Sequence, residues 1–506
     1  MKKLPALTSL LGAVAIAALL TRPADAQTPL PNDVLGSCAV SATEFDSWKS
    51  GTQGVFNAAD SATFNDATDC NFFKWGAQMF LWLTSQVDGT HVFDGADFLD
   101  VVKDGDVRNY VASTDTGVGV FAPRTEKTDD DAGVGQTGGG GVLIGPDDGI
   151  VYYGVKVNDL YAYYQAGVTS SAFNGELATN FPDSVSDMNV VVDYATTVFG
   201  VDGIDNSQAL AMEMKTSWIE ASLLPNDGEG YVTVEATVST WDKDNGSFWL
   251  QTGTEVKTLA LIGFHVVGSV NGHPEMVWAT FEHVNNAPQN GYFYFNATGA
   301  PTYQPYDGNG SDPWLFNASP DQGSLPVTEV IERATFKVIR YPVNDQITID
   351  LNFVIADEGQ SIGPNEVVRI NPWGDVYMTD ADAVEPTYGS TSTPTTRATD
   401  LVSLNQSIIN QLAADDVRRN YIQTGSIWSG GGSNQIPTSG TDQVLRGTLR
   451  LANSTMETFH QFPDSTGTGS FRPENCFGCH SVATNSSPSQ GVSHIFSSLV
   501  PLQPQN

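Results

Sequence analysis

The stretch that decides the fold runs from Val256 to His283, VKTLALIGFHVVGSVNGHPEMVWATFEH. Two segments rich in Val, Ile, Leu and aromatic residues flank Asn271-Gly272, a dipeptide that favours a two-residue hairpin turn. The pattern therefore predicts two antiparallel strands, Val256–Val267 and Glu275–His283.

The turn also sets the register of this hairpin. A two-residue turn would place His265 opposite Trp278 and Glu282 opposite Leu261 on one sheet face, with His283 on the other. A His, a Trp and a Glu on one apolar face form either a candidate site or a hydrogen-bonded polar cluster of the core. The core interpretation is favoured, because buried polar groups are usually satisfied within the protein.

Segments of similar composition predict a mainly β protein with α-helical additions (α+β), whose central region is antiparallel and β-sandwich-like. Helical spacing of apolar residues predicts helices over 71–84, 151–200 and 399–422. The predicted strands are Ala209–Glu220, Tyr231–Trp241, Val256–Val267, Glu275–His283, Tyr292–Asn296, Val327–Tyr341 and Gln346–Ala356.

Composition limits the function classes. The 506 residues are 40% hydrophobic, which is enough for a sizeable core and too much for a disordered chain. The net charge is −35, from 23 basic and 58 acidic residues. This balance argues against nucleic acid or an anionic membrane surface as a partner, since phosphate binding needs clustered Lys and Arg.

The first residues predict export. Lys2 and Lys3 precede an apolar stretch, Leu10–Leu20, and Ala24-Asp25-Ala26 has the small-x-small pattern of a cleavage site. Residues 1–26 are therefore expected to be a signal peptide, with cleavage after Ala26 and a periplasmic or secreted product. A membrane anchor is the alternative, but the apolar stretch is short for a span. No integral membrane span is expected in the mature chain.

Composition shifts along the chain suggest its organisation. A mixed, partly helical region is expected over 27–207, followed by an antiparallel β domain over 208–385. Residues 386–398, rich in Pro, Ser and Thr, are the expected linker. A helical and loop-rich region over 399–506 would carry the C-terminal motif described below.

Four cysteines form two pairs. Cys38 and Cys70 stand alone near the expected mature N-terminus, and in an oxidising compartment they predict a disulfide. Two buried thiols are the alternative. A disulfide closing this loop would stabilise the fold by roughly 3–4 kcal/mol in the chain-entropy model.

The second pair belongs to Cys476-Phe477-Gly478-Cys479-His480, the C-x-x-C-H pattern of covalent haem attachment. Two thiols at this spacing reach the two vinyl groups of one porphyrin, and the adjacent imidazole binds the iron. Cys476 and Cys479 are thus the expected thioether ligands and His480 the proximal iron ligand of one haem c. A zinc site is the competing interpretation, but a structural zinc site needs four suitably spaced ligands.

The sixth iron ligand is left open by the sequence. Met456, His460 and His494 are the nearby candidates, and an empty position is an equal alternative. A methionine ligand would raise the reduction potential relative to a histidine. The apolar residues around the motif would exclude water from the haem.

Other sites have weaker signals. Asp242–Asn245 and Asp307–Asp312 resemble calcium loops without matching the full template, so calcium stays an alternative to ordinary turn chemistry. The glycine run Gly138–Gly141 is followed by no Lys-Ser/Thr, which excludes a phosphate-binding loop. Neither a G-x-S-x-G nor an H-E-x-x-H motif occurs.

Several pieces resemble a family of large exported bacterial c-type cytochrome proteins with one C-terminal C-x-x-C-H motif. The resemblance spans most of the mature chain and implies one covalent haem on a mainly β scaffold, with no named reaction. In the first piece, Trp75-Gly76-Ala77-Gln78 departs from the family's usual Ser-Trp-Gln run. The pieces are Phe73–Leu83, Met214–Trp218, Trp278–Pro288, Leu451–Phe459, Cys476–His480 and Ser493–Phe496.

Three functions follow from these expectations. The leading hypothesis is an exported monohaem cytochrome that passes single electrons to or from a redox partner protein or a small molecule. The second is a haem-dependent oxidoreductase (a peroxidase, oxidase or dehydrogenase) whose β domain binds the substrate. The third is a haem-based sensor or binding module. All three require the cellular haem-attachment machinery as a partner.

Overall fold

The computed structural model describes residues 30–104, 107–112, 119–123, 141–246, 248–305, 307, 314–317, 327–332, 337–342, 362–369, 371–374, 395–430, 435–458 and 475–504. The helices are α1 (Ala42–Trp48), α2 (Asp69–Leu83), α4 (Asp159–Thr169), α5 (Val185–Tyr194) and α6 (Thr395–Ile409). The strands are β1 (Gln86–Val87), β2 (Thr90–His91), β3 (Phe98–Asp104), β4 (Val107–Ala112), β5 (Gly119–Pro123), β6 (Gly141–Val142), β7 (Tyr152–Asn158), β8 (Met212–Glu220), β9 (Thr233–Asp242), β10 (Phe248–Val270), β11 (His273–His283), β12 (Tyr292–Phe295), β13 (Pro301–Gln304), β14 (Val327–Glu332), β15 (Lys337–Pro342), β16 (Tyr421–Ser429) and β17 (Leu445–Gly447).

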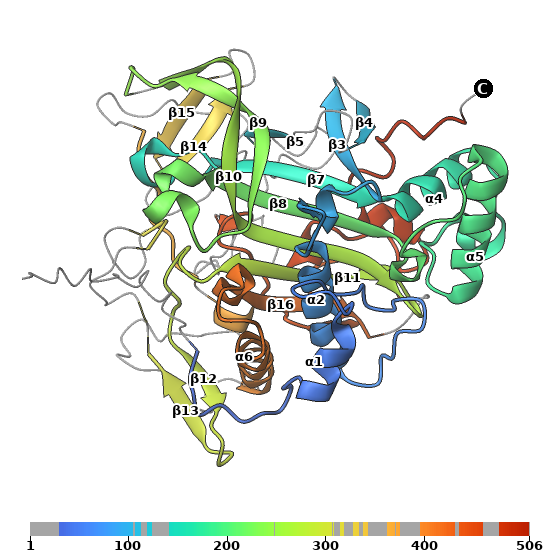
Figure 1. The fold of residues 1–506 in the computed structure, drawn as a ribbon, viewed down its shortest axis with the longest axis horizontal. Helices are drawn as coiled ribbons and strands as arrows, with labels where there is room; N and C mark the ends of the chain where they lie inside the picture. Colours follow the sequence, from blue (N-terminus) through green and yellow to red (C-terminus); the bar gives the residue numbers. More distant parts are fainter. Residues whose placement is uncertain are drawn as a thin grey trace, which may run out of the picture.

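One large, mainly antiparallel sheet organises the described chain, which confirms the predicted α+β class (Figure 1). The sheet has 13 strands and is held together by the 23-residue strand β10. The first half of β10 pairs with β9 and β15, and its second half pairs with β8 and β11. The β-rich central region is thus one continuous sheet that turns along β10.

The hairpin around Asn271-Gly272 forms, but its register differs from the expectation. His265 lies opposite Thr280, and Trp278 lies opposite Val267. The pairing shifts between Gly268 and Val270, next to the turn. Because the shift equals two residues, each side chain keeps its face, and His265, Trp278 and Glu282 do share one face as predicted.

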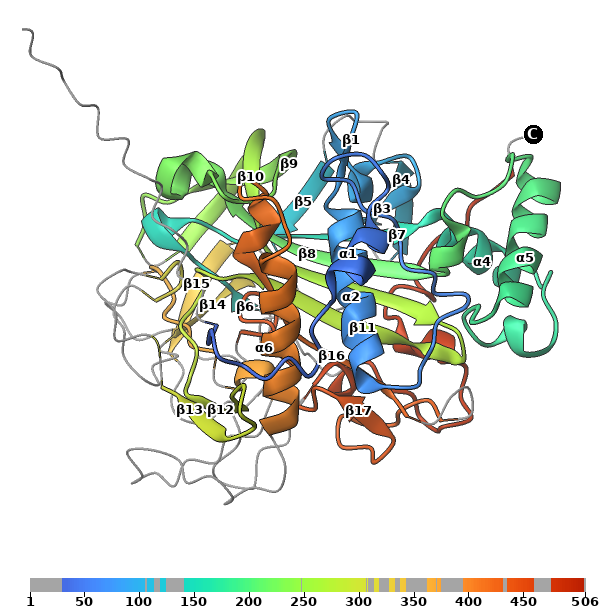
Figure 2. The same cartoon turned by 60° about the horizontal axis from the view of Figure 1, so that its bottom comes forward.

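The opposite face, which we call the helix face, packs against α2. Phe281 on this face stacks on Phe80 of α2 with ring centroids 4.4 Å apart. Gly76 lets α2 approach β11 and β16 closely, since a Cβ there would lie 2.7 Å from Ala279 and 2.9 Å from Gln423. Figure 2 shows α2 and α6 crossing this side of the sheet next to each other. The helix predicted over 71–84 is therefore confirmed as a core element.

The predicted disulfide is present: Cys38 is joined to Cys70, at the start of α2. The Cys38 backbone N–H also donates to Ser403 Oγ of α6 over 2.9 Å. The disulfide thus fastens the N-terminal segment beside both helices that cover the sheet.

Several predicted elements need correction. Residues 152–158, expected within a helical region, form the strand β7 before α4 and α5 begin. The helix expected over 399–422 ends at Ile409, and Tyr421–Ser429 is the strand β16. The segment predicted as the single strand Val327–Tyr341 is the pair β14 and β15. The predicted strand Gln346–Ala356 lies outside the described residues.

The expected regions meet within one sheet. Strand β7 from the N-terminal region pairs with β8 from the central region, and β16 from the C-terminal region pairs with β11. The expected signal peptide and residues 386–394 of the expected linker lie outside the described residues, and 395–398 begin α6.

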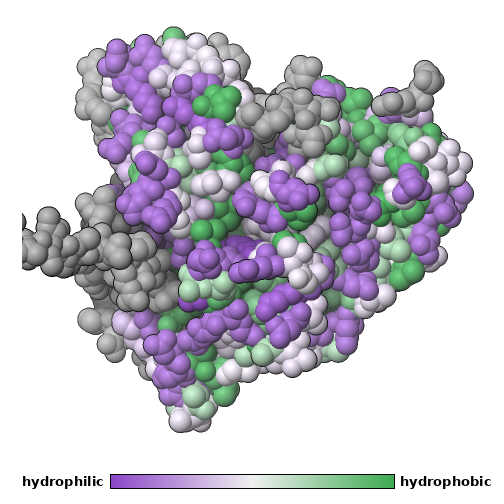
Figure 3. All heavy atoms as spheres, viewed as in Figure 1, coloured by the Kyte–Doolittle hydropathy of each residue, from purple (hydrophilic) through white to green (hydrophobic). Residues whose placement is uncertain are grey.

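Hydrophilic residues cover much of the described surface in Figure 3, with hydrophobic ones scattered between them. Within the described ranges, no helix has both the length and the apolar character needed to cross a membrane.

Candidate haem-attachment site

The C-x-x-C-H motif and the segment that precedes it lie against the sheet face opposite α2. We call this face the motif face and define it by Lys215 on β8, His265 on β10, and Trp278 and Glu282 on β11, whose register places them on one side of the sheet. The segment 448–458 and the C-terminal segment 475–499 contact this face. In Figure 1 the C-terminal segment, drawn in red, lies behind the central strands, away from α2.

Polar contacts fasten the segment that precedes the motif to the sheet. Asn453 Nδ2 donates to Thr280 Oγ1 over 2.8 Å, and the Thr455 and Ser217 hydroxyls are 2.7 Å apart. Gly263 on β10 makes this approach feasible, because a Cβ there would lie 2.4 Å from Thr455 Oγ1 and 3.0 Å from Asn453 Oδ1. The sequence 453–455 is therefore a structural clasp on the sheet.

Glu282 binds the same clasp through Ser454. Its side chain is fully buried; Oε2 accepts from Arg369 Nε over 2.8 Å, and Oε1 accepts from the Ser454 N–H over 2.8 Å. Arg369 also donates to the backbone carbonyls of His283 and Ala287. This arrangement supports the core interpretation for Glu282, because every contact made here satisfies a buried charge.

His265 has a different environment from Glu282. Its Nε2–H donates to Glu457 Oε1 over 3.1 Å, and Lys215 Nζ lies 3.8 Å from the same oxygen. The His265 side chain is 14% exposed, so solvent reaches it in the middle of the sheet face. An imidazole oriented by a carboxylate is the usual arrangement of a general base.

The C-x-x-C-H motif forms a tight turn beside this face. Cys476–Gly478 is a short 3-10 helix, and Asn475 caps it by accepting the Phe477 N–H over 3.0 Å. Asn475 Nδ2 donates to the Leu449 carbonyl over 2.9 Å, which ties the turn to the residues that precede the clasp. Cys476 and Cys479 are both partly exposed, as attachment to an incoming porphyrin requires.

His480 is held from several directions. Its Nδ1 lies 2.8 Å from the Val492 carbonyl, which can only accept, so Nδ1 carries a proton. The ring centroid lies 4.3 Å from that of Trp278 and 4.0 Å from that of His494. Metal-binding histidines typically donate their second nitrogen to such a carbonyl.

These features fit the chemistry of a c-type haem. The two thiols and the imidazole come from one turn, and the hydrogen bond at Nδ1 makes Nε2 the nitrogen that would bind an iron. The neighbouring side chains are apolar and buried: Trp278, Phe477, Val492 and Ile495 belong to one hydrophobic cluster. Such surroundings limit water access to an attached haem.

The three candidates for the sixth ligand lie in different places. Met456 is fully buried in a second hydrophobic cluster with Tyr153 and Ile219, separate from the one that contains Phe477. His494 stacks face to face on His480. His460 lies outside the described residues.

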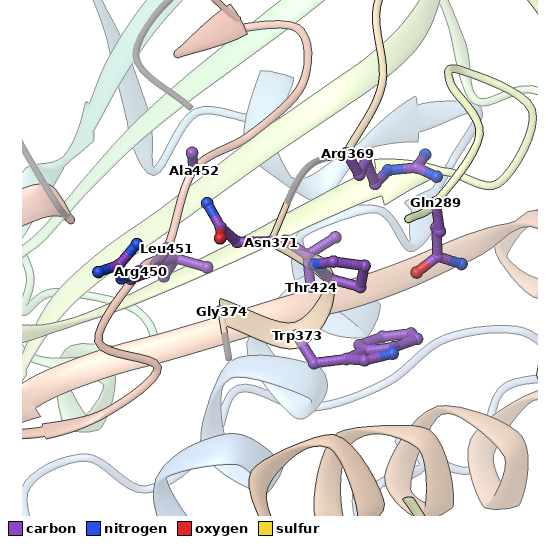
Figure 4. Close-up of a pocket in the computed structure, with 10 residues that line it drawn as sticks. Gln289, Arg369, Asn371, Trp373, Gly374, Thr424, Arg450, Leu451 and Ala452 are labelled. Carbon is purple, nitrogen blue, oxygen red and sulfur yellow. The ribbon is translucent and has the colours of Figure 1, made fainter. Parts of the chain in front are cut away.

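A small pocket lies between Arg369 and Gln289 on one side and Arg450 on the other (Figure 4). Trp373 and Thr424 also line it. Its interior has room for about one water molecule, which is far too small for a porphyrin.

In the part of the chain that the structure describes, no group of three or more His, Cys, Asp or Glu side chains could hold a metal ion. Asp242 Oδ1 accepts the Asp244 N–H over 3.0 Å, as in an ordinary turn. Most of the loop Asp307–Asp312 lies outside the described residues.

Sequence reasoning named His265, Trp278 and His480 but missed the residues that support them. Glu457 orients His265 and lies 3.8 Å from Lys215. The Val492 carbonyl accepts from His480, and Arg369 neutralises Glu282. Val492 is 12 residues from His480 and acts through its backbone, and Arg369 is 87 residues from Glu282, so neither carries a local signal.

No protein-family model matches this chain, and neither the curated proteins nor the solved structures contain a significant match.

Proposed function

We propose that this protein is an exported c-type cytochrome that carries one haem and passes single electrons. Cys476 and Cys479 would form the thioethers and His480 would bind the iron. The observation that carries the proposal is the hydrogen bond from His480 Nδ1 to the Val492 carbonyl, which prepares the imidazole of a C-x-x-C-H motif for metal binding.

The haem, when attached, would supply a one-electron carrier whose potential depends on its axial ligands and surroundings. The chain's own residues provide the attachment points, the orientation of the axial imidazole, and an apolar wall of Trp278, Phe477 and Ile495. The export signal predicted over 1–26 supports the proposal, because haem is attached covalently outside the cytoplasm.

The test is the absorption spectrum of protein exported in cells that have active haem-attachment machinery. We expect c-type bands in the reduced protein and haem staining on a denaturing gel. Protein that folds in the same cells without covalent haem would overturn the proposal.

A haem-dependent oxidoreductase is the second candidate, and the His265–Glu457 pair favours it. His265 is a diagonal neighbour of Trp278 on the motif face, since Trp278 lies two residues from Thr280, the residue opposite His265. Trp278 in turn contacts His480. A solvent-accessible imidazole oriented by a carboxylate so close to the motif could accept a substrate proton.

Carbon monoxide binding separates the two candidates. A reduced haem that ignores carbon monoxide has a filled sixth position and favours electron transfer. A haem that binds it readily has an open position and favours substrate chemistry. In the second case, His265→Gln should lower turnover while leaving the haem spectrum unchanged.

A further inference from the structure

Three consecutive residues, Val492, Ser493 and His494, contact the attachment motif and the elements that support it. The Val492 carbonyl accepts from His480 Nδ1 over 2.8 Å. His494 Nε2–H donates over 3.0 Å to the carbonyl of Cys479, which belongs to the peptide bond joining Cys479 to His480. One short segment therefore holds both the side chain and the backbone of the expected iron ligand.

The rings of His480 and His494 add a third contact. Their centroids are 4.0 Å apart and their planes differ by 16°, which is a face-to-face stack. Two axial ligands of one haem lie on opposite sides of the porphyrin and direct their nitrogens at each other. A face-to-face stack is a different arrangement, in which one ring supports the other.

Ser493 connects this segment to the rest of the fold. Its hydroxyl donates to Glu213 Oε2 on β8 over 2.7 Å and accepts from the Tyr161 hydroxyl on α4 over 2.9 Å. Tyr161 is fully buried. Ser493 thus anchors the segment that contacts the motif to the sheet and to a core helix.

We infer that Val492–His494 is a clamp that fixes the orientation of His480, and that His494 is a positioning residue rather than the sixth iron ligand. The inference rests on the proposed haem attachment at Cys476 and Cys479. Partners of a ligand tune the metal through ligand orientation and hydrogen bonding, so loss of the clamp should alter the haem while leaving it attached.

Four variants separate the contacts. His494→Phe keeps a ring that can stack but loses the donor to Cys479, and His494→Gln keeps a donor but loses the ring. Ser493→Ala removes the link to Glu213 and Tyr161. Ser486→Ala, an exposed position in the same C-terminal segment, is the matched control.

Two readouts are needed, the midpoint potential of the haem and the hydrogen exchange of the amides at 476–480. We expect every variant to keep covalent haem and the carbon monoxide response of the wild type. His494→Gln and Ser493→Ala should shift the potential relative to Ser486→Ala. Loss of one hydrogen bond in His494→Phe should speed amide exchange roughly fivefold to tenfold.

Two results would overturn the clamp. If His494→Phe changes the carbon monoxide response, His494 is an iron ligand. If haem is attached and every variant matches Ser486→Ala in potential and exchange, the segment positions nothing. If no protein, including the wild type, carries haem, the proposed function fails instead. Amide exchange in the haem-free proteins then decides the clamp alone, with faster exchange in His494→Phe supporting it and unchanged exchange overturning it.

Discussion

Arg369 Nε lies 2.8 Å from Glu282 Oε2, and both side chains are buried beneath the segment that leads to the C-x-x-C-H motif. The Ser454 N–H and hydroxyl bind the same carboxylate. One buried ion pair therefore holds the clasp against the sheet, although Arg369 and Glu282 are 87 residues apart in sequence.

Removing one partner of this pair should destabilise the protein strongly. We expect Glu282→Gln or Arg369→Met to cost roughly 3–5 kcal/mol in the free energy of unfolding, because the remaining charge stays buried without compensation. Urea denaturation followed by tryptophan fluorescence measures the loss. The control is Glu220→Gln, whose ion pair with Lys257 is partly exposed and should be worth about 0–1 kcal/mol. Equal stability of Glu282→Gln and the control would contradict a structural role for the pair.

Met456 should prove to be a core residue rather than an iron ligand. It is fully buried among aliphatic and aromatic side chains of a cluster separate from that of Phe477. We expect Met456→Leu, which roughly conserves volume, to cost less than about 1.5 kcal/mol and to leave the reduced haem spectrum unchanged. Met456→Ala should cost about 2–5 kcal/mol. A spectral change in the stable Met456→Leu variant would show instead that the thioether binds the iron.

The main hairpin could be predicted because its signal is local. Asn271-Gly272 sets the turn, and the flanking apolar residues set the strands. The register could not be predicted, because it depends on an irregularity next to the turn, where Met276 adopts a positive φ of 68°. Strand β16 was missed because all nine of its residues are buried, so it lacks the alternation that marks a strand with one solvent face.

The candidate site likewise contains some residues that the sequence predicts and others that only the structure reveals. Cys476, Cys479 and His480 form a contiguous motif, so the sequence alone makes them candidates. The groups that orient His480 and Glu282, namely the Val492 carbonyl and Arg369, are brought in by tertiary structure. A backbone carbonyl carries no sequence signal, which is why Val492 could be found only in three dimensions.

Substitution of the two cysteine pairs should affect different properties, haem attachment for Cys476 and Cys479 and stability for Cys38 and Cys70. Cys476→Ala or Cys479→Ala should abolish double thioether attachment, and the double variant should lose haem staining on a denaturing gel. Replacing Cys38 and Cys70 together by Ser should leave haem staining intact and lower stability by roughly 3–4 kcal/mol. Unchanged haem staining in Cys476→Ala/Cys479→Ala would show that the motif does not attach haem.

Asp159, at the start of α4, should make the protein less stable as the pH rises. Burial, with the neighbouring charge of Asp97 adding to it, raises the pKa of Asp159 from 3.8 to about 8. Between these two pH values the folded protein binds a proton that the unfolded chain releases, so the free energy of unfolding falls as the pH increases through this window. Asp159→Asn imitates the protonated carboxyl at every pH.

We therefore expect the melting temperature of Asp159→Asn to match that of the wild type near pH 4 and to exceed it increasingly up to about pH 8.5. Thermal unfolding followed by circular dichroism across this range tests the expectation. Asp193→Asn, at an exposed position of α5, measures the effect of an Asp-to-Asn substitution alone. A melting-temperature difference that is constant with pH would show that the Asp159 carboxyl titrates alike in the folded and unfolded states, and that its burial does not alter its protonation.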